Sequence, residues 1–363
     1  MPAPARIVPS TFILKLPKAE LHLHLEGSVQ PATLAELSRR HPTPLPAENN
    51  RYRPDPGSGD PLDEAAVRRL YNYKDFQGFL LAFKAVTERL RTPEDYELVT
   101  YELMRQLRAE NVLHAEVYIS VGVVHWRGQE FSPLFAGLER GRERGARDFG
   151  ISLLWIFDAV RHFGVEEAQR VAELAALLRE EQMAKGGESS SSIVAIGIGG
   201  DESRAPAKDF HAVYQYAHKH GLRLTAHAGE TVGPDSIWGA LNIKAERLGH
   251  GLRSIEDPEL IEHLVEQQIP VEICISSNVA TGCCARIEDH PVKKLFDAGV
   301  MITLNTDDPA MFHTSLAREY QIAQDVFGFS DEQLREIARN SFEASFLPAE
   351  QKVEFLESLD RTR

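Results

Sequence analysis

The sequence has few cysteines, no long apolar run and a shortage of positive charge. Its 363 residues include three cysteines, Cys274, Cys283 and Cys284, which excludes a disulfide framework and predicts reduced thiols. No apolar run approaches the roughly 20 residues that a membrane-spanning helix needs. The apolar patch near the N-terminus, at 11–14, is too short for the core of a signal peptide, so we expect a cytoplasmic protein with no membrane partner.

The charge balance excludes a further class of partner. Lys and Arg number 40 against 54 Asp and Glu, which gives a net charge of −14. Binding to nucleic acids is dominated by contacts from Lys and Arg to phosphate, so we expect no nucleic-acid partner. A small neutral or cationic molecule, or one with a single anionic group, remains compatible as substrate. Composition carries no indication of the oligomeric state.

Strand-like and helix-like segments alternate along the chain. Stretches rich in Val, Ile, Leu and aromatic residues are separated by segments long enough for helices. Eight such stretches lie at 20–26, 112–120, 151–159, 193–200, 223–230, 246–251, 270–278 and 301–309. This alternation implies parallel strands with helices outside, and eight strands close a (β/α)8 barrel. We therefore predict an α/β protein, a TIM barrel forming one domain over residues 1–363.

One interval is too long for a single crossover helix. It holds a Pro- and Gly-rich stretch at 41–62, followed by two periodic segments at 73–90 and 93–110. We expect a helical insertion over about 28–110, after the first strand, with a loop followed by two or three helices. Two interpretations remain open: a lid at the catalytic mouth, or an elaboration that only adds core.

Polar residues crowd at the C-terminal ends of the predicted strands, where barrel enzymes build their sites. His22 and His24 are two apart, so their side chains share a face of the first strand. His227 ends the fifth strand, and Asp307 and Asp308 end the eighth. Three histidines and one of the two aspartates, with a water molecule, suit a catalytic zinc ion that keeps an open position.

Other carboxylates surround this set, and His250 ends the sixth strand. Glu26 falls on the same face as the two histidines of the first strand. Strict alternation would turn Glu230 and Asp308 away from the ligands beside them, but Gly229 permits an unusual backbone turn. We therefore expect Glu230 and Asp308 to curl over the barrel top, where they and His250 supply proton chemistry around the bound water.

Five motifs together resemble the adenosine deaminase family of the amidohydrolase superfamily. They are LHLHLEG at 21–27, GGDE at 199–202, HAGE at 227–230, GHG at 249–251 and TDDP at 306–309. They occur in the order that the family shows and span most of the chain. The resemblance agrees with the barrel that the alternation of segments predicts.

The resemblance implies a metal site and a set of catalytic residues. One zinc ion per chain is implied, with the ligands His22, His24, His227 and Asp307. Glu230 matches the acid that protonates the purine at N1. His250 matches the histidine that orients and helps deprotonate the zinc water, and Asp308 matches the aspartate that holds the attacking hydroxide. Burial beside the metal site is expected to raise the pKa of Glu230.

The implied reaction is hydrolytic deamination at C6 of a 6-aminopurine nucleoside, such as adenosine or 2′-deoxyadenosine, to the 6-oxo product and ammonia. The implied substrate contacts are His24, Glu26, Gly200 and Asp308, with the backbone N–H of Gly200 meeting purine N3. Glu26 stands where adenosine-specific members usually carry aspartate, which binds the ribose 5′-hydroxyl. Adenine, AMP and aminodeoxyfutalosine, an adenosine-like menaquinone precursor with a 5′ benzoate extension, therefore remain alternative substrates.

Some residues have two open interpretations. Arg161 either meets an anionic substituent of the substrate or pairs with a carboxylate of the protein. Phe76, Phe79 and Phe83 either cover the purine or pack in the core, because their spacing is helical.

Three competing functions are disfavoured. A zinc amidohydrolase for another ring or amide does not require Glu230 three residues after His227, nor the upstream GGDE motif. A two-metal hydrolase often uses a modified lysine late in the fourth strand, and 193–200 contains no lysine. A non-catalytic binding protein on this fold is expected to lack Glu230, His250 or Asp308, all of which are present.

Overall fold

The strands of the computed structural model form one parallel, nearly closed barrel. The structure describes residues 7–43, 45, 61–73, 75–187 and 191–362. Neighbouring strands pair in chain order, from β1 to β8. A bridge between Leu23 and Asp307 links the first strand to the segment after the last one. The strands are β1 Lys18–His24, β2 Val112–Ile119, β3 Ser152–Val160, β4 Ile193–Gly199, β5 Arg223–Ala228, β6 Arg247–His250, β7 Val271–Ile273 and β8 Ile302–Leu304.

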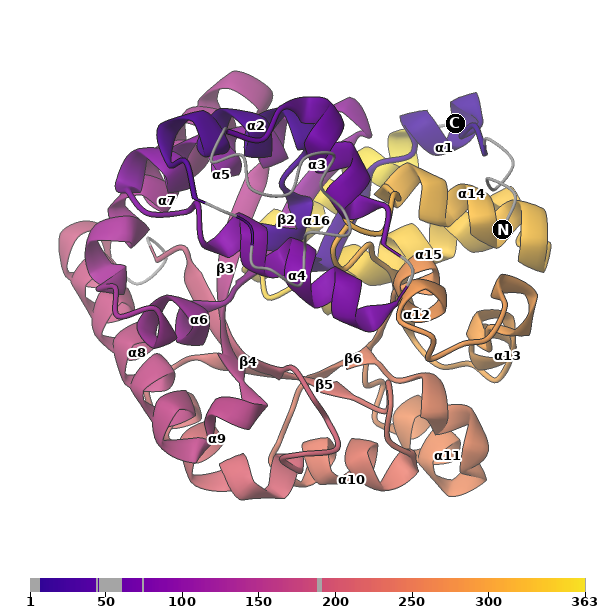
Figure 1. The fold of residues 1–363 in the computed structure, drawn as a ribbon. Helices are drawn as coiled ribbons and strands as arrows, with labels where there is room; N and C mark the ends of the chain where they lie inside the picture. The colour runs from indigo at the N-terminus through magenta and orange to yellow at the C-terminus, as the bar shows by residue number, and fades with distance from the viewer. Residues whose placement is uncertain (1–6, 44, 46–60, 74, 188–190, 363) are drawn as a thin grey trace.

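Helices surround this barrel, as Figure 1 shows, and the predicted (β/α)8 fold is confirmed. Most strand residues are buried on both faces, which explains their near-continuous apolar runs. The helices are α1 Thr11–Lys15, α2 Pro31–Arg40, α3 Glu64–Tyr71, α4 Phe76–Thr87, α5 Pro93–Ala109, α6 Val121–Trp126, α7 Phe131–Phe149, α8 Val165–Gly186, α9 His211–Lys219, α10 Pro234–Asn242, α11 Pro258–Glu266, α12 Ile275–Ala280, α13 Val292–Asp297, α14 Leu316–Phe327, α15 Asp331–Ala344 and α16 Ala349–Arg361.

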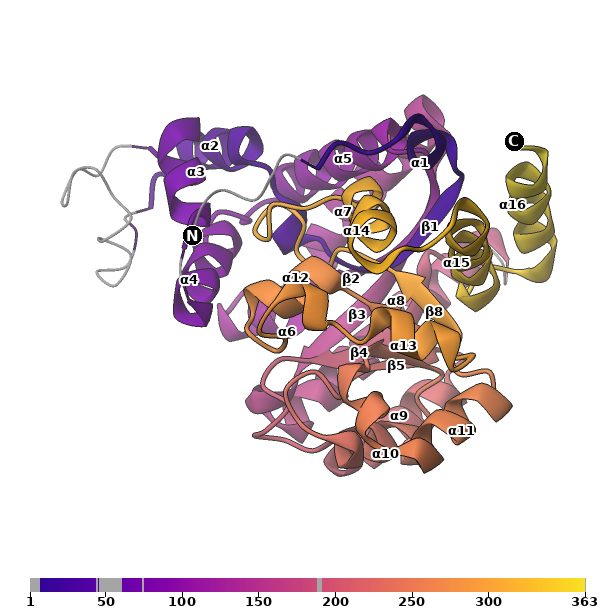
Figure 2. The ribbon, with the colours of Figure 1, turned by 90° about the vertical axis from the view of Figure 1, so that its right-hand side faces the viewer.

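Four helices, α2 to α5, lie in the described part of the segment between β1 and β2, where we expected two or three, and the first begins earlier than expected. Helix α2 occupies 31–40, where we expected a loop, and its first residue is a proline, which suits a helix start. Helix α5 begins with a capping box in which Thr92 and Asp95 satisfy each other's backbone N–H groups. Figure 2 shows α2, α3 and α4 gathered at one end of the barrel, opposite α16. Most of the 41–62 stretch lies outside the described residues.

Helix α4 packs on the segment that follows β8. The Phe79 ring stacks on Phe312, with centroids 5.1 Å apart, and Phe83 contacts Phe79. The Tyr73 hydroxyl donates to the Met311 carbonyl oxygen. Phe79 and Phe83 are therefore partly buried against the main core. The side chain of Phe76 lies outside what the structure describes.

The last two strands fall furthest short of their predicted lengths. Strands β7 and β8 have three residues each, and α12 begins inside the predicted seventh strand. A short apolar run does not distinguish a buried strand from the helical turn that follows it. Strand β8 ends at Leu304, and the chain then turns at Asp307, whose φ of 65° is left-handed. No helix in the described part of the chain is both long and apolar enough to cross a membrane.

Candidate active site

Four buried side chains converge at the C-terminal end of the barrel. One ligand atom from each of His22, His24, His227 and Asp307 lies within 4.8 Å of the others. The His24 Nε2 atom lies 3.3 Å from the His227 Nε2 atom and 3.4 Å from the Asp307 Oδ1 atom. The structure thus brings together the four residues that the sequence predicts as metal ligands.

Neighbouring groups aim these ligands at one another. The Nδ1 atom of His22 lies 2.8 Å from a Glu272 carboxylate oxygen, and the Nδ1 atom of His227 lies 3.1 Å from the Ile198 carbonyl oxygen. Because those oxygens accept, each Nδ1 carries the proton and each Nε2 keeps its lone pair for a metal. The Ser277 hydroxyl donates to Asp307 Oδ2 at 2.6 Å, which leaves Oδ1 facing the histidines.

The donor set fits a metal ion on a further observation. The Nε2 atom of His22 is buried and has no hydrogen-bond partner among the described residues. Burial lowers the pKa of His22, His24 and His227, so the imidazoles are in the form that binds metal. A buried polar atom without a partner is costly, and a metal ion would satisfy it. A metal-binding site is therefore present in this chain.

A hydrogen-bonded chain sets the orientation of His250, which ends β6. The Val292 N–H donates to His290 Nδ1, so His290 Nε2 donates to the Asn278 amide oxygen. The Asn278 amide nitrogen then donates to His250 Nδ1 at 3.0 Å. His250 consequently carries its proton on Nε2, the atom that lies 3.7 Å from Glu230 Oε2.

Glu230 lies beside this histidine, where the sequence places it. Gly229 has a φ of 69°, and the chain turns there so that Glu230 reaches the site. The thiol of Cys283 lies 3.7 Å from the other carboxylate oxygen. Burial raises the pKa of Glu230, while the nearby His250 partly opposes this effect. Burial thus favours the protonated form of this carboxyl group.

Asp308 follows Asp307, a predicted metal ligand, and is also buried. Its Oδ1 atom has no hydrogen-bond partner among the residues that the structure describes. Burial, followed by the charge of Asp307, raises the pKa of Asp308 well above its usual value. A Cβ atom on Gly27 would lie 1.8 Å from this oxygen, so only glycine fits there. The LHLHLEG motif therefore ends in the residue that makes room for Asp308.

Glu26 lies in a short 3-10 helix, η1 Glu26–Ser28, and not on the face of the first strand where strict alternation placed it, because β1 ends at His24. Its Oε1 atom accepts from the Ser120 N–H at 3.1 Å, and its Oε2 atom is buried without a partner in the described part of the chain. Burial raises the pKa of Glu26 to about 7. This buried carboxyl oxygen therefore has unused hydrogen-bonding capacity.

The structure also shows the surroundings of Gly200 and Arg161, two residues that the sequence analysis singled out. Gly200 follows β4 with a φ of 85°, and a Cβ atom there would lie 3.1 Å from a His162 ring nitrogen. Arg161 is fully buried, and its guanidinium donates to the carbonyl oxygens of Ala205 and His227. Of the two interpretations of Arg161, the structure favours pairing within the protein. Its hydrogen-bond partners are backbone carbonyl oxygens and not the carboxylate that we expected.

Sequence reasoning missed several residues around the site: Asp158, Glu202, Glu272, Ser277 and Asn278. The signal for Asp158 was a lone acidic residue within the apolar stretch of the third strand. Its Oδ1 atom is buried and has no partner among the described residues. Burial, with a contribution from Glu26, raises the pKa of Asp158 well above its usual value. The signal for Glu202 was its place in the GGDE motif.

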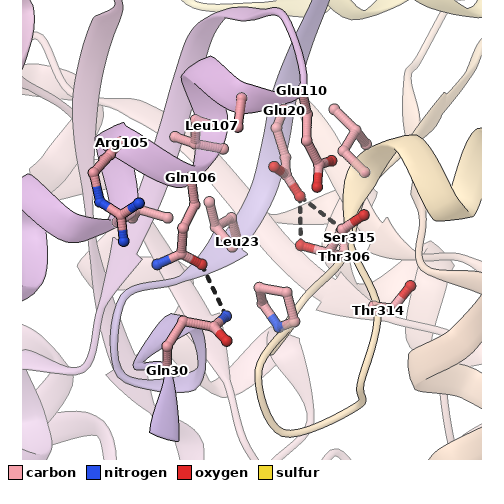
Figure 3. A pocket seen from close by; sticks show the side chains of 14 residues that line it. Glu20, Leu23, Gln30, Arg105, Gln106, Leu107, Glu110, Thr306, Thr314 and Ser315 are labelled. Atoms are coloured by element: carbon pink, nitrogen blue, oxygen red, sulfur yellow. Dashed lines mark hydrogen bonds between the residues drawn. The ribbon is translucent and has the colours of Figure 1, made fainter. Parts of the chain in front are cut away.

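A separate cavity of about 440 Å³ lies behind the segment that carries Asp307. Figure 3 shows Glu20 hydrogen bonded to Thr306 on one side and Gln30 bonded to Gln106 on the other. None of the four predicted metal ligands lines it. The cavity is therefore distinct from the site described above.

Comparisons with known proteins agree with this geometry. Residues 17–362 match the family model described as adenosine deaminase. An aminodeoxyfutalosine deaminase of Streptomyces avermitilis is 37% identical over 96% of this chain and 92% of that protein. An adenine deaminase of Chlorobium phaeobacteroides is 33% identical over 96% of this chain and 97% of that protein.

A solved structure shares the whole architecture. The adenine deaminase of Arthrobacter aurescens superposes with a TM-score of 0.84 at 29% identity, covering 95% of this chain and 98% of that chain. The family match spans nearly the entire sequence and includes all five motifs. The chain therefore belongs to the adenosine deaminase family, as the resemblance indicated, and is a deaminase that hydrolyses a C–N bond of a small-molecule substrate.

Proposed function

We propose that this protein is a zinc-dependent deaminase that hydrolyses the C6 amino group of the purine in aminodeoxyfutalosine. The observation that carries the chemistry is the convergence of three histidines and one aspartate beside Glu230, His250 and Asp308. The substrate is supported by the similarity to the Streptomyces enzyme and by Glu26. Adenosine and 2′-deoxyadenosine, which the motifs alone favoured, have less support from the relatives described above.

Zinc suits the donor set of His22, His24, His227 and Asp307. Three neutral imidazoles and one carboxylate are typical ligands of a catalytic zinc ion, which keeps a further position for water. When bound, such an ion lowers the pKa of water to about 7 and so supplies a nucleophile at neutral pH. We propose one zinc ion per chain.

The remaining groups of the site divide the proton chemistry among them. Glu230, whose pKa is raised, holds the proton that purine N1 must receive before C6 becomes a good electrophile. His250 donates from Nε2 and so orients the attacking water. The free oxygen of Asp308 accepts the proton that this water gives up and passes it to the C6 amino group, which leaves as ammonia. A positioned acid of this kind contributes about 10²–10⁴-fold in rate.

Adenine is a second candidate substrate. The enzymes of Chlorobium phaeobacteroides and Arthrobacter aurescens described above are named adenine deaminases. Adenine lacks the N9 substituent, so it would leave the outer part of the site to water. The two candidates therefore differ in how much of the rate depends on groups beyond the purine ring.

A deamination assay on purified, zinc-loaded protein tests the proposal. The panel is aminodeoxyfutalosine, adenine, adenosine, 2′-deoxyadenosine and AMP, with ammonia release as the readout. We expect the highest kcat/KM with aminodeoxyfutalosine. A higher value with adenine would select the second candidate, and inactivity on every compound would refute both.

Glu26 is the residue that we expect to contact the part of the substrate beyond the purine. Glu26→Asp moves the carboxyl group by about 1.5 Å, one carbon–carbon bond. We predict that it changes the ranking of kcat/KM across the panel and leaves zinc content unchanged. Glu36→Asp, on the exposed part of α2, is the control. An unchanged ranking in Glu26→Asp would show that Glu26 does not contact the substrate.

A further inference from the structure

A second buried carboxylate organises the turn that carries Glu230. Glu202 follows β4 and is 6% exposed. It accepts hydrogen bonds from four consecutive backbone N–H groups, those of Gly229, Glu230, Thr231 and Val232. The bonds to Glu230, Thr231 and Val232 measure 3.1, 2.9 and 3.1 Å. Successive N–H groups that converge in this way form a cradle for an anion, and here the protein supplies the anion itself.

The carboxylate has no capacity left for a ligand. Its Oε1 atom accepts from the Gly229 N–H and the Ser236 hydroxyl, and its Oε2 atom accepts the other three N–H groups and the Thr231 hydroxyl. A carboxylate offers about four lone-pair sites, so these six donors saturate it. Glu202 therefore does not itself contact the substrate, and any effect on the reaction must pass through the turn.

The turn is also held at its beginning. The guanidinium of Arg161 donates to the carbonyl oxygen of His227, the residue that starts the HAGE motif. Arg161 and Glu202 attract each other electrostatically across this segment. The segment 227–232 thus begins with a predicted metal ligand and contains Glu230, and two buried side chains of opposite charge bind its backbone.

We propose that Glu202 is a positioning residue, which holds the backbone of the turn at 229–232 so that the Glu230 carboxyl group faces His250. This inference rests on the function proposed above, in which Glu230 delivers a proton to the purine. Four N–H groups on one rigid, buried acceptor leave the turn little freedom. A displacement of a catalytic group by about 1 Å can cost about 100-fold in rate, so this constraint matters for turnover.

The first test is Glu202→Gln in the zinc-loaded enzyme. The amide nitrogen cannot accept hydrogen bonds, so part of the cradle is lost while the size of the side chain is kept. We expect kcat to fall by about 10- to 100-fold, with KM changed much less and one zinc ion retained per chain. A kcat equal to that of the wild type, measured per zinc-loaded chain, would overturn the inference.

A double variant separates positioning from general destabilisation. If Glu202 acts through Glu230, then Glu202→Gln combined with Glu230→Gln is no slower than Glu230→Gln alone. A purely structural role predicts instead that Glu202→Gln slows the Glu230→Gln enzyme by the same factor as it slows the wild type. That additive result would overturn the inference even if the single variant were slow.

The chain offers a matched control at the other end of β5. There Glu246 accepts from the Leu224 N–H at 3.1 Å and pairs with Arg223, far from the metal ligands. Glu246→Gln should leave kcat unchanged. If Glu202→Gln shows no cooperative thermal transition, Glu202→Asp replaces it, with the same comparisons and a smaller expected fall in kcat. Wild-type inactivity on the whole substrate panel would overturn the proposed function together with this inference.

Discussion

Two features of its surroundings suit Glu230, the last residue of the HAGE motif, to act as an acid. Glu230 combines a pKa raised by burial with a carboxyl oxygen 3.7 Å from His250 Nε2. Glu230→Gln keeps the shape but removes the ionisable proton. We predict that this variant binds one zinc ion per chain and loses most of its kcat, because the metal ligands are untouched. Metal analysis and steady-state kinetics measure both quantities, and an unchanged kcat would exclude Glu230 as the acid.

Inside the barrel, Glu116 and Arg247 form a buried ion pair, and Arg247 also pairs with Glu272. Burial alone would raise the pKa of Glu116, but the guanidinium of Arg247, with His114 and the Phe346 N–H, lowers it to about 2. The Glu116 Oε2 atom lies 2.5 Å from Arg247 Nη1. Because the pKa of Glu116 is lower in the folded state than its usual 4.5, this group stabilises the fold fully above that pH. The stabilisation is lost as the pH falls toward 2.

Glu116→Gln should therefore lower the free energy of unfolding of the metal-free protein by about 3 kcal/mol at pH 7. The difference in the free energy of unfolding between this variant and the wild type should shrink below pH 4.5, because the stabilisation from the wild-type carboxylate decreases there. Urea unfolding of both proteins at a series of pH values measures this difference. Glu36→Gln, which breaks only exposed ion pairs, should change stability by less than about 1 kcal/mol. A pH-independent difference would contradict the assignment to Glu116.

Among the elements, strand β6 approaches β1 and β5 so closely that one position tolerates only glycine. A Cβ atom on Gly249 would lie 2.6 Å from His22 Cε1 and 3.0 Å from His22 Nδ1. Gly249→Ala must therefore displace a predicted metal ligand. We predict at least a tenfold loss of zinc affinity, comparable to that from altering groups around a ligand.

Gly233, at the start of α10, is the matched control for that substitution, because a Cβ atom there meets no atom within 4 Å. Gly233→Ala should keep the zinc affinity of the wild type. Competition with a chromophoric chelator measures both variants. Equal zinc affinities for Gly249→Ala and the wild type would show that His22 can move without loss of binding.

The sequence predicts strands well where an apolar run marks them, and it predicts poorly where each strand ends. The eight strands follow from their apolar runs, because parallel strands are buried on both faces. The ends of β7 and β8 do not follow, because a single left-handed residue, Asp307, or the first turn of α12 leaves no periodic trace. Helix α2 was missed because its segment is short and lies beside the Pro- and Gly-rich stretch.

For the whole molecule, the barrel explains why the clustering of His22, His24, His227 and Asp307 could be predicted and their hydrogen-bond partners could not. Strand ends of a closed parallel barrel converge, so polar residues at those ends must meet. The partners depend instead on register across the barrel. His22 and Glu272 lie 250 residues apart, and neither residue alone indicates the other. The same is true of Ser277 and Asp307, or of Asn278 and His250.

The same topology predicts that the metal stabilises the entire fold. Two of the predicted ligands come from β1, one from β5 and one from the segment after β8. A bound ion would therefore join the first and last strands of the barrel to its middle. The unfolded chain cannot hold these groups together. Zinc in excess of its dissociation constant by about 1,000-fold should therefore add about 4 kcal/mol to the free energy of unfolding.

Chelation should consequently lower the Tm of the wild type, and one equivalent of zinc per chain should restore it. His22→Ala should remove this response. His220→Ala should retain it, because the His220 side chain contacts Tyr216 at the end of α9 and is not one of the predicted metal ligands. Calorimetry with and without zinc compares the three proteins. Identical Tm values for loaded and metal-free wild type would mean that these four side chains do not share an ion, because ligands contributed by three distant segments cannot bind a metal ion without stabilising the barrel that assembles them.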